Sequence, residues 1–172
     1  VQQQNQLRDQ RILTTTAWQS TTNQAFALEG IIRSCGDAIN WYSEHIAPLP
    51  DVAAICDQVL EKDSGETIYF IPALQGMGAP FWNNHMTASF LGMKRTTTQQ
   101  DLLRAVLEST IFQIKAVIDV MEEVSGRMIN HVMIDGGMSK NIGLMTLLAT
   151  LLHKEVIVSE VEEFSAIGMM AM

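Results

Sequence analysis

A chain of 172 residues is long enough to bury a substantial core, and its 47% hydrophobic and 17% charged residues exclude a disordered protein. A formal net charge of −8 argues against nucleic acid or an anionic membrane surface as the partner. Two cysteines without metal or redox spacing indicate thiols in a reducing compartment. Because no apolar run is long enough to span a bilayer, we expect a cytoplasmic protein.

The first third of the chain predicts a β-hairpin followed by two helices. The polar, glutamine-rich residues 1–10 are expected to be disordered. Threonine and branched residues favour strands at 11–19 and 25–28, on either side of a polar turn. Apolar residues at helical spacing predict a helix that starts at Ile31 and ends before the prolines at 48 and 50. A shorter helix capped by Asp51 follows.

The rest of the chain alternates strands with helices. The longest predicted helix begins at Thr98, whose partner Asp101 makes a pattern typical of a capping box, and it ends at Gly126. The predicted strands cover residues 67–71, 88–91, 131–134 and 155–159, and another helix follows the paired glycines at 136 and 137. This alternation predicts an α/β domain with a partly parallel sheet.

The stretch from His131 to Asn141 carries the strongest functional signal. A strand, a paired-glycine turn and a helix start follow one another, so the backbone could approach a flat ring or a phosphate and offer free N–H groups. An ordinary tight turn would have the same pattern, and both interpretations stay open at this point. Asp135 could bind a metal or a hydroxyl, but a side chain at this position more often caps the turn.

Two pairs of residues repeat one spacing, a glycine followed four residues later by an asparagine. Gly36 and Asn40 would lie on one side of the first helix, where a glycine costs about 1 kcal/mol relative to alanine. Either close helix packing or clearance for an adenine ring, with Asn40 as its hydrogen-bond partner, would explain that glycine. Gly137 and Asn141 could form the opposite wall of the same slot.

The remaining candidate residues give weaker signals. Arg104 and Glu108 are predicted to form a solvated pair on a helix, and the four histidines lack ligand spacing, so no metal site is assigned. Phe81 and Trp82, in a loop rich in glycine and proline, could stack on a sugar. They could equally pack within the loop.

Six motifs, in order and at fitting intervals, resemble the C-terminal domain of the FGGY carbohydrate kinases. The run from Gly76 to Trp82, Gly-Met-Gly-Ala-Pro-Phe-Trp, has the form found in the glycerol kinase branch of that family. The motifs are Leu13–Trp18, Phe26–Gly30, Gly36–Trp41, Pro72–Trp82, Arg104–Glu108 and Asp135–Asn141.

The resemblance implies a ribonuclease-H-like fold of the actin and hexokinase type, with a mixed sheet flanked by helices and apparently truncated at both ends. Residues 11–172 would form part of the nucleotide-binding domain. In the intact enzyme ATP, with Mg²⁺, would donate a phosphoryl group to a small polyol or sugar such as glycerol. The residues implied at the nucleotide site are Gly36, Asn40, Gly136, Gly137 and Asn141.

The family's catalytic aspartate, its substrate motif and its N-terminal domain would all lie before Val1. We therefore assign no catalytic residue and expect this chain alone to be inactive. Homo-oligomerisation stays open. The alternative is a truncated, non-catalytic remnant that binds nucleotide weakly or serves as an interaction module, and a further one is a lobe whose glycine pairs serve packing only.

Overall fold

A computed structural model of the chain describes residues 9–61, 65 and 67–159, so most of the segment expected to be disordered lies outside the described residues. The elements in chain order are β1 (Leu13–Gln19), β2 (Gln24–Glu29), α1 (Gly36–His45), α2 (Val52–Glu61), β3 (Tyr69–Ile71), β4 (Ser89–Leu91), α3 (Gln99–Ser125), β5 (His131–Ile134), the short 3₁₀ helix η1 (Gly137–Lys140), α4 (Ile142–Leu152) and β6 (Glu155–Val158).

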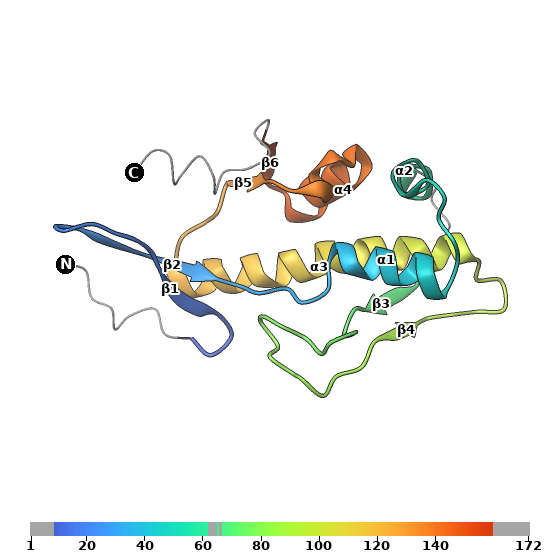
Figure 1. The fold of residues 1–172 in the computed structure, drawn as a ribbon, viewed down its shortest axis with the longest axis horizontal. Helices are drawn as coiled ribbons and strands as arrows, with labels where there is room; N and C mark the ends of the chain where they lie inside the picture. The colour runs from blue at the N-terminus through green and yellow to red at the C-terminus, as the bar shows by residue number, and fades with distance from the viewer. Residues whose placement is uncertain (1–8, 62–64, 66, 160–172) are drawn as a thin grey trace.

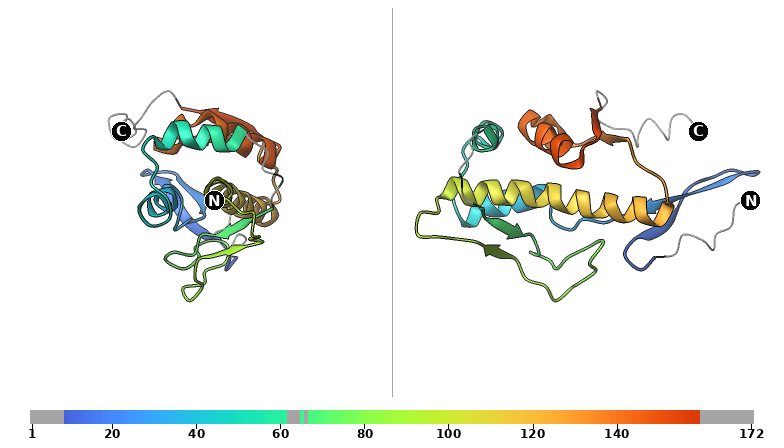
Figure 2. Two further views of the ribbon diagram at one scale, coloured as in Figure 1. Left: turned by 90° about the vertical axis from the view of Figure 1, so that its right-hand side faces the viewer. Right: turned by 180° about the vertical axis from the view of Figure 1, so that it is seen from behind.

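The long helix α3 lies at the centre of the molecule (Figure 1). Helix α1 runs beside it, the β3–β4 pair covers one side, and α2, α4 and the β5–β6 pair cover the other. An end-on view shows these three layers (Figure 2). α3 contacts α1, α2, α4 and β3, so one helix joins all of the layers.

Helix α3 begins and ends where the sequence predicts. Thr98 Oγ1 accepts a hydrogen bond from the Asp101 backbone N–H at 3.3 Å, and Asp101 Oδ2 accepts one from the Thr98 N–H at 2.8 Å, which confirms the capping box. Gly126 ends the helix with a φ of 64°. On the inner face Leu103, Leu107 and Ile111 are each 1% exposed, and burying a side chain of this size contributes roughly 2 kcal/mol.

The described strands form three separate two-stranded sheets. β1–β2 and β3–β4 pair antiparallel, whereas β5 and β6 pair parallel, with α4 as the crossover between them. The predicted mixture of parallel and antiparallel pairing is therefore present, distributed over three pairs. The base of the β1–β2 hairpin packs on the second half of α3, where Ile12 joins Val117 and Val120 in a small buried cluster.

Helix α1 starts five residues later than predicted. Residues 31–35 are not helical, because their backbone groups bond to other parts of the fold: the Ile31 carbonyl accepts from Ala79 N–H at 2.9 Å, and the Ser34 carbonyl accepts from Gln113 Nε2 at 3.0 Å. The interpretation of Gly36 as a glycine inside a helix is therefore wrong, since Gly36 is the first residue of α1. The penalty for an interior glycine does not apply there.

The second predicted helix is confirmed as α2. Asp51 Oδ1 accepts a hydrogen bond from Ala54 N–H at 3.1 Å, as expected of a residue that caps the first turn. Among the described residues, no helix is both long and apolar enough to cross a membrane.

Candidate nucleotide-binding site

The paired-glycine turn follows the end of β5. Asp135 Oδ1 accepts a hydrogen bond from Gly136 N–H at 2.6 Å, so this carboxylate caps the turn, which is the role that we favoured over metal binding. Gly136 has a φ of 100°, which side chains other than glycine rarely adopt. Ser139 donates its hydroxyl to the Gly136 carbonyl at 2.7 Å, and this hydrogen bond links the two ends of the turn.

The outer surface of this turn is open. A Cβ atom added at Gly136 or at Gly137 would meet no heavy atom within 4 Å. Packing against the rest of the chain therefore does not require glycine at position 137, where φ lies outside the left-handed region. The two residues expose a bare stretch of backbone that a ligand could approach closely.

Asn141 caps a helix, a role that we did not predict from the sequence. The turn continues into η1 and not directly into an α-helix, and Asn141 is the N-cap of α4: its Oδ1 accepts from Leu144 N–H at 2.7 Å. An asparagine directly before an apolar helix is a recognised capping signal, so the pattern was available in the sequence. The oxygen already accepts this hydrogen bond, and the Nδ2 group is the part of the side chain that can donate to a ligand.

The start of α1 lies against this turn. A Cβ atom at Gly36 would lie 3.3 Å from Met138 Sδ, and Cys35 Sγ approaches the same sulfur to 3.5 Å. The structure thus brings Gly36 beside the side chain of Met138, the residue that follows Gly137. The thioether of Met138 occupies the space next to Gly36. Asn40 lies one helical turn further along α1 and is exposed.

Helix α3 fixes the segment that precedes α1 through a buried hydrogen bond. Gln113, only 4% exposed, donates to the Ser34 carbonyl and so fixes the residues that precede Gly36. Burial raises the pKa of the Cys35 thiol, which therefore stays protonated at neutral pH and is a poor nucleophile.

An ion pair fixes the β5–α4–β6 unit on α3. Lys154, in the turn between α4 and β6, lies 2.6 Å from Glu122 Oε1, and the two side chains are 9% and 16% exposed. Glu122 also accepts from the Ile129 N–H at 2.7 Å, just before β5. The Lys154 ammonium, followed by that N–H, lowers the pKa of Glu122.

The second glycine-rich loop has a packing role. A Cβ atom at Gly78 would collide with the Ile31 carbonyl oxygen, and one at Gly76 would lie 2.8 Å from the Asn83 carbonyl oxygen. Trp82 Nε1 donates to the Arg11 carbonyl at 2.9 Å, so this ring packs within the domain. Phe81 is 55% exposed.

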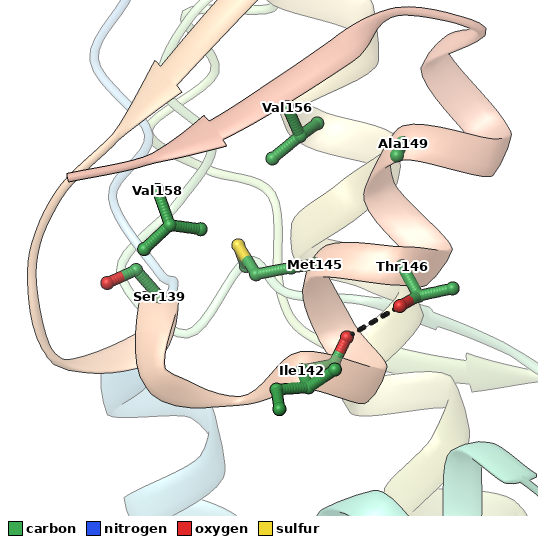
Figure 3. Close-up of a pocket in the computed structure, with 7 residues that line it drawn as sticks. All are labelled: Ser139, Ile142, Met145, Thr146, Ala149, Val156 and Val158. Atoms are coloured by element: carbon green, nitrogen blue, oxygen red, sulfur yellow. Dashed lines mark hydrogen bonds between the residues drawn. The ribbon is translucent and has the colours of Figure 1, made fainter. Parts of the chain in front are cut away.

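A hollow of about 380 Å³ lies between α4 and β6, adjacent to η1 (Figure 3). Apolar side chains form most of its lining, and its two hydroxyl groups already donate to backbone carbonyls: Ser139 to Gly136, and Thr146 to Ile142 at 2.9 Å. The hollow therefore lacks a free polar group on these side chains to orient a polar ligand. Its lining residues are Ser139, Ile142, Met145, Thr146, Ala149, Val156 and Val158.

The described part of the chain contains no group of three or more His, Cys, Asp or Glu side chains that could hold a metal ion.

Arg104 and Glu108 form the predicted pair, with Nε and Oε1 2.7 Å apart and both side chains about a fifth exposed.

The chain belongs to the FGGY family of carbohydrate kinases, whose C-terminal domain matches residues 1–172. The mixed α/β domain is thereby confirmed as the actin-like C-terminal fold of that family.

Glycerol kinases are among the proteins that this chain resembles. That of Saccharolobus islandicus (strain L.S.2.15 / Lassen #1) is 35% identical over 165 residues, which cover 95% of this chain and 33% of that protein. Glycerol kinase 1 of Thermotoga maritima is 32% identical over 160 residues, 93% of this chain and 32% of that protein. The crystal structure of Plasmodium falciparum glycerol kinase with ADP has a TM-score of 0.82 at 27% identity, covering 91% of this chain and 31% of that chain. The chain thus spans about a third of the length of these relatives.

Proposed function

We propose that this chain forms the adenine-nucleotide side of an ATP-dependent kinase that phosphorylates a small polyol or sugar such as glycerol. One observation carries the proposal: the backbone of Gly136 and Gly137 is open, and the next residue, Met138, packs its thioether against Gly36 at the start of α1. The presence of ADP in the structure of the Plasmodium falciparum glycerol kinase supports adenine nucleotide as the ligand.

The residues fit a nucleotide by shape and by hydrogen-bonding capacity. The backbone of Gly136 and Gly137 is open to a ring or a ribose, and Asn141, four residues after Gly137, has an Nδ2 group that can donate to a ligand. Gly36 and Asn40 would form the facing wall, where Asn40 is exposed and able to bond a base. ATP supplies the transferable γ-phosphoryl group, whereas these residues bind and orient the adenosine.

We assign neither a catalytic residue nor a Mg²⁺ ligand to this chain. Asp135, the carboxylate nearest the turn in sequence, is used in capping it, and no metal-binding group occurs among the described residues. Since phosphoryl transfer depends on positioned phosphates and an oriented hydroxyl, we expect the purified chain to bind nucleotide without transferring phosphate. Measurable turnover of ATP with glycerol by the pure chain would contradict this expectation.

The experiment is a calorimetric titration of ADP into the wild-type chain, Asn141→Asp and Asn141→Ala. Aspartate keeps an oxygen for Leu144 N–H but loses the Nδ2 donor, so we expect binding at least about fivefold weaker with the α4 cap intact. Alanine loses both the cap and the donor. Its free energy of unfolding should also be lower by about 1 kcal/mol, with a lower melting temperature. A wild-type chain that binds no ADP at millimolar concentration would overturn the proposed function.

A further inference from the structure

A carboxylate from α2 reaches the first turn of α4. Asp57 Oδ1 accepts a hydrogen bond from Gly143 N–H at 3.3 Å, although the two residues are 86 positions apart. The start of α4 therefore has two side-chain acceptors, Asp57 for the N–H of Gly143 and Asn141 for that of Leu144. Negative charge is also favourable at a helix N-terminus, where the free N–H groups point outward.

Gly143 allows this approach. A Cβ atom there would lie 3.0 Å from Asp57 Oδ1 and 3.5 Å from Asn141 Oδ1, so the carboxylate and the asparagine amide meet at the same place. Leu60 Cδ1, one turn further along α2, would lie 3.4 Å from this added Cβ atom. The missing side chain at Gly143 thus lets α2 pack directly on the residues that follow the glycine turn.

We propose that Asp57 is a positioning residue for the nucleotide site, which acts by holding the side chain of Asn141 in its orientation. With Asp57 bonded to Gly143, the Asn141 oxygen needs to serve only Leu144, which fixes the amide plane and with it the direction of the Nδ2 group. Without Asp57, the Asn141 oxygen is the nearest acceptor for both N–H groups and turns toward Gly143, which moves the Nδ2 group. This inference rests on the proposed function.

The test compares ADP affinity in the wild-type chain, Asp57→Ala, Asp57→Asn and Asp51→Ala. We expect Asp57→Ala to weaken ADP binding by roughly fivefold, because one acceptor of a partly buried N–H group is lost. Asp57→Asn keeps an acceptor oxygen and should restore the affinity to within about twofold of the wild type. Asp51→Ala removes the cap of α2 but not its contact with α4, and it should also stay within about twofold.

Three outcomes would overturn the positioning role: unchanged affinity in Asp57→Ala, no rescue by Asp57→Asn, or an equal loss in Asp51→Ala. The last result would mean that any loosening of α2 weakens binding.

A second readout does not depend on nucleotide. In NMR spectra of the free chain, Asp57→Ala should shift the Asn141 side-chain amide resonances and speed hydrogen exchange at Gly143. If the wild-type chain binds no ADP while these changes occur, the proposed function fails and the orientation of Asn141 by Asp57 stands. Unchanged resonances would overturn the inference whatever the affinity.

Discussion

The chain contains two glycine-rich turns that look alike in sequence and differ in space. At Gly76 and Gly78 an added Cβ atom would run into backbone oxygen atoms of Asn83 and Ile31, respectively. At Gly136 and Gly137 it would meet nothing within 4 Å. Packing requires glycine in the first turn, whereas in the second turn only the backbone conformation of Gly136 requires it, and the space over both residues is not filled by the domain. Gly36 lies between these extremes, because its neighbour is the flexible thioether of Met138.

The largest effect that this comparison predicts is on folding, at Gly78. In Gly78→Ala the new methyl group would collide with the carbonyl oxygen of Ile31, which already accepts a hydrogen bond from Ala79 N–H. The methyl group is attached directly to the backbone and the oxygen is a backbone atom, so the clash can be relieved only by moving the chain. We expect the free energy of unfolding to fall by at least about 2–3 kcal/mol. Urea unfolding measures it, with Gly137→Ala as the matched control. Equal unfolding midpoints for the two variants would remove the distinction between the turns.

The next effect is on binding and not on folding. In Gly137→Val the branched side chain would project into the open space over the turn, so the free energy of unfolding should change by less than about 1 kcal/mol. ADP affinity should fall by at least about tenfold, because the nucleotide would need the same volume. Calorimetry and urea unfolding of the same preparation measure both quantities. If ADP binds this variant as well as the wild type, the open turn is not the nucleotide site.

The smallest effect concerns pH, because ion pairs join α3 to the residues before β1 and to the unit that carries the second turn. Lys154 lowers the pKa of Glu122, and Arg11 lowers the pKa of Glu123 and brings that of Asp9 to about 2. A carboxyl group whose pKa is lower in the folded state stabilises the fold above its ordinary pKa and loses that contribution as the pH falls through the folded value. The free energy of unfolding should therefore decrease as the pH is lowered from about 4.5 toward about 2.

Amide hydrogen exchange in this acidic range would separate the two turns. The turn at 135–139 should lose protection before the loop at 76–79, since Glu122 and Lys154 tie the β5–α4–β6 unit to α3. In Lys154→Met the carboxylate of Glu122 loses its ammonium partner, so the two turns should lose protection at more similar pH values. Simultaneous loss of protection at both places would show that the ion pair does not hold the second turn specifically.

The sequence predicted those parts of the fold whose signals are local. The capping box at Thr98 and the left-handed Gly126 set the ends of α3 without help from other elements, and Asp51 capped α2 in the same way. The start of α1 was missed, because residues 31–35 continue the helical pattern but give their carbonyls to Ala79 and Gln113. Periodicity does not reveal such competing tertiary bonds.

The residues of the candidate site stay a prediction, whereas their arrangement could not be inferred from the sequence. The repeated glycine and asparagine spacing led to Gly36 and to the turn at Gly137, and the structure adds that the Met138 thioether packs against Gly36. The dual role of Asn141 could have been inferred from its place before an apolar helix. The contact of Asp57 with Gly143 could not, because nothing in either segment indicates that helices so far apart in the chain pack together.

The central position of α3 bears on how the molecule comes apart. Its 27 residues extend for about 40 Å, and α1, α2, α4 and β3 all rest on it. Unfolding of α3 would therefore remove a packing partner from each of these described elements. Heat or denaturant should therefore dismantle these layers in a single cooperative step, and a lesion at either end of the rod would lower the melting temperature of the whole.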